Sequence, residues 1–122
     1  MNRAYDLIAV TSMGVRITPM NRQPVGTGSG YIMQATSAES NVLNVSASLG
    51  LKTRALTAFV EGSPIAAFIK GELRRRGIDT LAKEVPQGGP WGYRHQFNIA
   101  DSGFGPRGPR VWNDRSGEVG RT

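Results

Sequence analysis

The sequence predicts an α/β protein, and two observations lead to that fold class. A helix, a strand and a second helix follow one another between residues 36 and 79, each with its own start and stop signals. A short apolar run, Asp6 to Val10, has the length and composition of a central parallel strand that is buried on both faces. Helices that alternate with strands need a sheet to lie on, so we expect a parallel sheet with helices against it.

The first predicted helix follows Thr36. The hydroxyls of Ser37 and Ser40 can cap the exposed amides of its first turn, and Gly50 suits the left-handed position after its last. Its apolar residues fall on one face at helical spacing. They are Val42, Leu43, Val45 and Leu49.

The strand and the second helix are marked by local chemistry. Residues 51–60 are rich in strand-forming side chains and favour a buried strand. Ser63 and Pro64 then supply a cap and a proline at the first helical position, and Gly77 ends the helix. The apolar stripe of this helix is Ile65, Phe68, Ile69 and Leu73.

The remaining segments predict a second, smaller sheet. Thr11 to Gly14 leaves the first strand at the carboxyl edge, where open α/β sheets place their ligands. Residues 15–19 and 31–34 alternate as two one-sided antiparallel strands, and residues 91–99 and 110–113 extend the pattern. We therefore expect one domain over residues 1–122, with a core at about 1–13 and 36–85 and a second sheet at about 14–35 and 91–115.

Composition excludes several kinds of site. The 122 residues allow one modest domain. They include no apolar run long enough to span a membrane, and we expect neither a membrane partner nor a signal peptide. No cysteine is present, which excludes disulfides and thiolate metal sites and agrees with a cytoplasmic protein. The single histidine, His95, cannot form a histidine metal cluster.

The net charge of +6 allows either a nucleic-acid binder or a protein that attracts small anions. The basic residues show no repeated interleaving with aromatic residues, which disfavours nucleic acid as a partner. The preferred interpretation is that the arginines are spread over solvated faces and attract small anionic metabolites.

The order of these elements resembles the ribokinase-like (PfkB) carbohydrate kinases, and most of all their 2-keto-3-deoxygluconate kinase branch. The segments that carry the resemblance are Ser37 to Val42, Ser48 to Thr53, Ile69 to Asp79 and Val111 to Arg115. The resemblance implies the N-terminal part of a ribokinase-like three-layer core with a small antiparallel β-sheet lid over the sugar. It covers about the first third of what the family needs.

The resemblance also implies a sugar-binding set, namely Ser37, Asn41, Asn113 and Arg115. Asn41 matches the asparagine that opens the first helix beside the sugar, and Arg115 matches a lid arginine that contacts acid sugars. A guanidinium suits a carboxylate because its planar fork binds both oxygens. The plainer alternatives are a polar residue in a helical first turn for Asn41 and an exposed strand-end arginine for Arg115.

Several positions depart from the family pattern. Thr36-Ser37 replaces a Gly-Gly pair, and Asn113 replaces a tyrosine two residues before the lid arginine. Arg16 lies where many members carry an acidic or apolar residue. The sugar could therefore be a keto-deoxy sugar acid or a neutral ketose.

The family also implies ATP and Mg²⁺. Its members transfer the γ-phosphoryl of ATP with a late Gly-Ala-Gly-Asp segment, whose amides form an anion hole at a helix N-terminus and whose Asp deprotonates the sugar hydroxyl. No such segment occurs before Thr122, so we assign no catalytic, nucleotide-binding or metal-binding residue and expect the chain alone to be inactive. A non-catalytic remnant, which binds sugar or forms a homodimer through the lid sheet, is the alternative.

Overall fold

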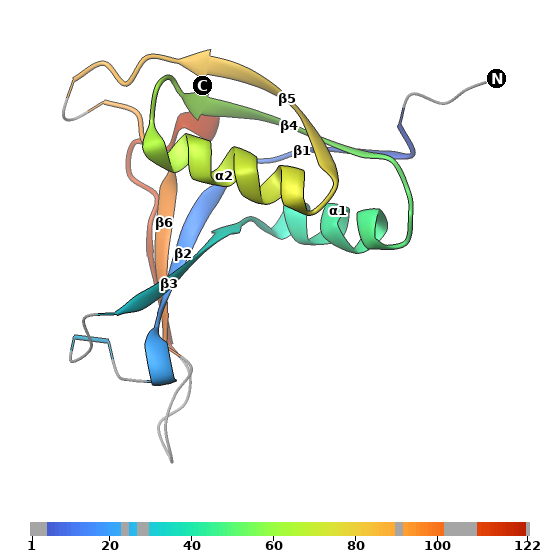
Figure 1. The fold of residues 1–122 in the computed structure, drawn as a ribbon. Helices are drawn as coiled ribbons and strands as arrows, with labels where there is room; N and C mark the ends of the chain where they lie inside the picture. The colour runs from blue at the N-terminus through green and yellow to red at the C-terminus, as the bar shows by residue number, and fades with distance from the viewer. Residues whose placement is uncertain (1–4, 23–24, 27–29, 90–91, 102–109, 122) are drawn as a thin grey trace.

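The computed structural model describes residues 5–22, 25–26, 30–89, 92–101 and 110–121 (Figure 1). They form two sheets and two α-helices. The elements are β1 (Leu7–Val10), β2 (Gly14–Pro19), β3 (Tyr31–Thr36), α1 (Ala38–Ser48), β4 (Thr53–Val60), α2 (Pro64–Arg75), β5 (Ile78–Val85), β6 (Gln96–Asp101) and β7 (Arg110–Asp114), with 3-10 turns at Met20–Arg22 and Val119–Arg121. Among the described residues, no helix has the length and hydropathy that a membrane crossing requires.

The first sheet is parallel, as predicted, and has the strand order β1-β4-β5. Both helices lie on the same face of this sheet (Figure 1), and their buried side chains form one cluster with Ala55 and Phe59 of β4. The described chain therefore supplies one helix layer and one sheet layer of an α/β core.

The prediction that residues 6–10 form a central strand buried on both faces is wrong. β1 is an edge strand, with Ile8 51% and Val10 75% exposed. Among the described residues, α1 and α2 cover the opposite face, and Val119 of the C-terminal 3-10 turn packs on this one, against Ala58 and Val60.

Helix α1 begins as predicted, because Ser37 is its N-cap and accepts a hydrogen bond from the Ser40 amide. The predicted apolar face is only partly used. Leu43 is fully buried, whereas Val42, Val45 and Leu49 are 58%, 60% and 75% exposed. The helix rests on the sheet through Leu43, Ser40 and Ala47. The exposed side chains of Val42, Val45 and Leu49 therefore point away from the sheet.

Helix α2 matches its sequence signals. The Ser63 hydroxyl accepts hydrogen bonds from the Ile65 and Ala66 amides, and Pro64 is the first helical residue. Ile69 and Leu73 are fully buried, and Ile65 and Phe68 pack against the same cluster. Gly77 has a φ of 76°, which lets the chain turn directly into β5.

The second sheet, called the lid from here on, has the strand order β3-β2-β6-β7. It extends away from the parallel core (Figure 1). The predicted antiparallel pairing is confirmed for β2–β3 and for β6–β7, but the two central strands, β2 and β6, run parallel. The strand expected from residue 91 begins only at Gln96, and residues 91 and 102–109 lie outside the described part of the chain.

His95 joins the lid to the core. Its Nε2 accepts a hydrogen bond from the Val60 amide at 3.3 Å, and its Nδ1 donates to the Met13 carbonyl at 3.2 Å. The ring is 9% exposed and lies 5.7 Å from the Phe59 ring. A neutral imidazole with its proton on Nδ1 satisfies both backbone groups, whereas protonation of Nε2 would remove the acceptor for Val60.

We predict that this joint makes the protein less stable in mild acid. Burial lowers the pKa of His95 below its ordinary value of about 6.5. The bond to Met13 and the carboxylates of Glu118 and Glu84 raise that pKa in part, and Lys70 lowers it further. A lowered folded-state pKa stabilises the fold above pH 6.5 or so, and this contribution is lost as pH falls toward the folded-state value.

The measurement is the free energy of unfolding in urea at several pH values between 7.5 and 5, for the natural chain and for His95→Gln. The natural chain should lose stability across this window more steeply than the variant, in which the imidazole is absent. Parallel curves for the two proteins would show that His95 does not control the acid response.

Candidate functional site

A cleft lies where the lid meets the N-terminus of α1. One part of it is a cavity of about 260 Å³ whose lining is dominated by polar side chains. All four residues of the predicted sugar-binding set line this one cavity, although they come from the α1 cap, the first turn of α1, β7 and the residue after β7. They are Ser37, Asn41, Asn113 and Arg115.

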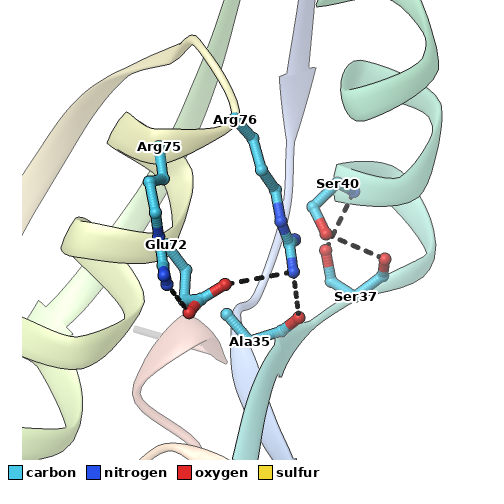
Figure 2. Close-up of polar contacts among 6 residues, drawn as sticks. All are labelled: Ala35, Ser37, Ser40, Glu72, Arg75 and Arg76. Carbon is cyan, nitrogen blue, oxygen red and sulfur yellow. Dashed lines mark hydrogen bonds and ion pairs between the residues drawn. The ribbon is translucent and has the colours of Figure 1, made fainter. Parts of the chain in front are cut away.

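Ser37 fixes the core side of the cleft. It is 6% exposed, and its hydroxyl accepts hydrogen bonds from the Ser40 amide at 2.9 Å and from Thr11 Oγ1 at 2.8 Å (Figure 2 shows the Ser40 contact). It also lies 3.3 Å from Met13 Sδ, toward which it donates. Because this hydroxyl is already engaged, Ser37 forms a wall of the cleft and holds the turn in place.

The C-terminal end of α2 also supports the turn that precedes α1. Arg76 donates from Nη2 to the Ala35 carbonyl at 3.3 Å, and Glu72 lies 3.4 Å from the same nitrogen (Figure 2). Glu72 also pairs with Arg75. Ala35 is buried and precedes Ser37 by two residues, so this contact ties the last residues of β3 to the core.

Two amide side chains face the cavity with their hydrogen-bonding groups available. Asn41 is exposed in the first turn of α1, and Asn113 is exposed on β7 opposite Asn98. Neither side chain bonds to another described residue. Each can donate to one hydroxyl of a ligand and accept from another, which suits a polyol.

The lid side of the cleft contains two arginines. Arg115 donates from Nε to Gln96 Oε1 at 3.1 Å, and Arg16 donates from Nε to Asn98 Oδ1 at 3.0 Å. Gln96 and Asn98 are two residues apart on β6 and face the same side of the lid. The sequence analysis did not place Arg16 in the site. The signal was the alternation of Val15, Arg16 and Ile17, which sets the arginine on the opposite face from its apolar neighbours.

An adjoining cavity of about 290 Å³ continues the cleft toward the core and shares Ser37 and Arg115 with the first. It adds two carboxylates, Glu39 and Glu118, which accept hydrogen bonds from Thr11 and Ser12. Thr11 and Ser12 follow β1, so the cleft lies at the carboxyl edge of the parallel sheet, where the sequence analysis expected a ligand.

Two features of the described residues concern the binding of a nucleoside triphosphate and its metal ion. Ser37 accepts a hydrogen bond from the Ser40 amide at the start of α1, and Ser63 accepts from the Ile65 and Ala66 amides at the start of α2, so these three amides are already engaged. Across the ranges that the structure describes, no three carboxylate, histidine or cysteine side chains come close enough to hold a metal. The glycines of residues 27–29 and 103–105 lie outside those ranges.

Comparison with known proteins gives structural matches only, since no protein-family model and no curated protein matches the sequence. The 2-dehydro-3-deoxygluconokinase of Thermotoga maritima aligns with 93% of this chain at a TM-score of 0.83 and 20% identity. A PfkB family carbohydrate kinase from Listeria grayi aligns with 93% at a TM-score of 0.81 and 23% identity. An uncharacterized sugar kinase from Pyrococcus horikoshii, in complex with ATP, aligns with 93% at 0.75 and 12%.

The chain spans only about a third of these structures, with 33%, 34% and 35% of their lengths covered. At these identities the likeness concerns the fold. It confirms the fold that the sequence resemblance implied: the described residues have the architecture of one third of a ribokinase-like carbohydrate kinase, with its lid.

Proposed function

We propose that this chain is the sugar-binding, N-terminal part of an ATP-dependent carbohydrate kinase. One observation carries the proposal. The four residues that the family resemblance assigned to the sugar line one cavity between lid and core, although up to 78 positions separate them in the sequence, from Ser37 to Arg115. An accidental resemblance would not require them to meet. Such a kinase would work in the cytoplasm.

The chemistry of the cavity suits a small hydroxylated acid. Asn41 and Asn113 offer amides for hydroxyl groups, and Arg115 offers a fork for a carboxylate. This favours a keto-deoxy sugar acid over a neutral ketose. In this proposal, phosphoryl transfer uses a nucleotide and a metal ion that are bound elsewhere in the complete enzyme.

The parallel sheet supports the view that these residues work within a larger domain. Its uncovered face exposes Ile8, Val10 and Leu81 at 51%, 75% and 57%. A parallel sheet is normally covered on both faces, because its side chains are apolar on both. The remaining two thirds of a kinase would supply that cover.

The alternative is a non-catalytic remnant that binds sugar or dimerises through the lid. One observation favours dimerisation. An apolar row crosses all four lid strands on the face opposite Arg16 and Asn98. It is formed, in direct register, by Met33, Ile17, Ile99 and Trp112. Met33 and Trp112 are 36% and 46% exposed. Such a row is a surface on which a second lid could pack.

We predict that the purified chain produces no ADP that depends on an added sugar. The reason is that phosphoryl transfer needs an anion hole and a base, and the sequence contains no Gly-Ala-Gly-Asp segment to supply them. The measurement is a coupled ADP assay with ATP, Mg²⁺ and either 2-keto-3-deoxygluconate or D-fructose, with a complete sugar kinase as the positive control. ADP release above the sugar-free rate would contradict the proposal that this part of the enzyme does not transfer the phosphoryl group by itself.

We also predict that Arg115→Gln weakens the binding of 2-keto-3-deoxygluconate about tenfold and changes D-fructose binding little. Loss of one charge-assisted bond to a carboxylate has roughly this effect. The measurement is isothermal titration calorimetry, and Arg74→Gln, an equal charge change on the exposed end of α2, is the matched control. Equal losses of affinity for both sugars would contradict the assignment of the ligand's carboxylate to Arg115. A natural chain that binds neither sugar would contradict the proposed function.

A further inference from the structure

Arg16 is a second guanidinium in the cavity, and its side chain is held in place. It projects from β2 beside Asn98, whose side chain accepts from Arg16 Nε at 3.0 Å. Asn98 is only 7% exposed, and Arg16 itself is partly buried. This hydrogen bond to a buried amide oxygen restricts the rotamers of the arginine, so less conformational entropy is lost when a ligand binds.

Arg16 and Arg115 are anchored in the same way. Each uses Nε to donate to an amide oxygen of β6, at Asn98 and Gln96 respectively. An arginine has five N–H donors, so this arrangement leaves the four terminal N–H groups of each guanidinium for a ligand or water. Neither arginine forms an ion pair with another described residue.

The cavity around them is positively charged. Its other described lining residues are neutral: Thr36, Ser37, Ala38, Gln96, Asn98 and the two asparagines already described. The carboxylates Glu39 and Glu118 line the adjoining cavity, which Arg115 also borders but Arg16 does not. Arg16 therefore marks the end of the cleft where a negative charge is compensated best.

We propose that Arg16 is a specificity-determining residue, which binds the acid group of the sugar together with Arg115. This inference rests on the proposed function, because it presumes that the cavity takes a sugar. It goes further by making the preference for an acid depend on Arg16, which the family resemblance did not assign to the site. It also orients the ligand, with the carboxylate toward β2 and β6 and the hydroxyl groups toward Asn41 and the core.

The alternative role of Arg16 is structural, since it satisfies the buried oxygen of Asn98. The two roles separate in their dependence on ligand charge. A structural arginine should affect all ligands alike through the shape of the lid, whereas an acid-binding arginine should affect only ligands that carry a carboxylate.

The test is calorimetric titration of the natural chain, Arg16→Gln, Arg16→Lys and the control Arg74→Gln with 2-keto-3-deoxygluconate and with D-fructose. Arg16→Gln should weaken the sugar acid about tenfold and leave D-fructose within about twofold. Arg16→Lys keeps the charge and a donor for Asn98 but loses the fork, so its affinity for the acid should be intermediate. The affinity of the natural chain for the acid should also fall with added NaCl more steeply than that of Arg16→Gln.

Three results would overturn the inference, and they differ in what else they affect. If the natural chain binds the sugar acid and Arg16→Gln binds it equally well, the inference fails and the proposed function stands. If Arg16→Gln weakens both sugars equally while Arg16→Lys restores both, the arginine is structural. If the natural chain binds neither sugar, the inference and the proposed function fail together.

Discussion

The buried hydrogen bonds around Ser37 are the contact on which the rest of the structure depends. One hydroxyl joins Thr11 after β1, Met13 at the start of the lid and the amide of Ser40 in α1. These three segments are the carboxyl edge of the core, the exit to the lid and the first turn of the helix. A cleft between two sheets has a defined shape only if the two sheets are held together where they meet. Buried polar groups with all their hydrogen bonds satisfied provide such a rigid junction.

The same junction between lid and core explains how a polar cleft can exist in a small domain. On the core side, Arg76 and His95 each bind a main-chain carbonyl near the point where the chain changes sheets. On the lid side, the amides of β6 hold the arginines. Side chains with a structural partner thus surround Asn41 and Asn113, whose side chains bond to none of the residues that the structure describes. The side-chain amides of these two asparagines are available to a ligand because the described fold makes no use of them.

The sequence was informative where the signal was local. The cap at Ser63, the proline after it and Gly77 describe α2 completely, because each acts within one turn of the helix. The sequence was misleading where the outcome depended on packing against an element far away in the chain. The spacing of Val42, Val45 and Leu49 indicates a helix but not which side faces the sheet, and a run of apolar residues at β1 does not say whether a layer covers both faces. The parallel pairing of β2 with β6 has no local signature at all. Ser37, Asn41, Asn113 and Arg115 could be grouped beforehand only through the family pattern, and Arg16 was missed because it departs from that pattern.

The parallel pair at the centre of the lid has a consequence for how the protein is made. Arg16 and Asn98 are neighbours in the lid and 82 positions apart in the chain, with the helices and the last core strand between them. During synthesis, β2 and β3 leave the ribosome early but can pair only with each other, and a two-stranded ribbon is marginal by itself. The lid is therefore completed last, after the core has been synthesised, and contacts of such long sequence separation form slowly. A nascent chain stopped before β6 would hold a helix-covered sheet and half a cleft, without Asn98, Gln96 or Arg115, so the proposed ligand site is completed only with the final quarter of these residues.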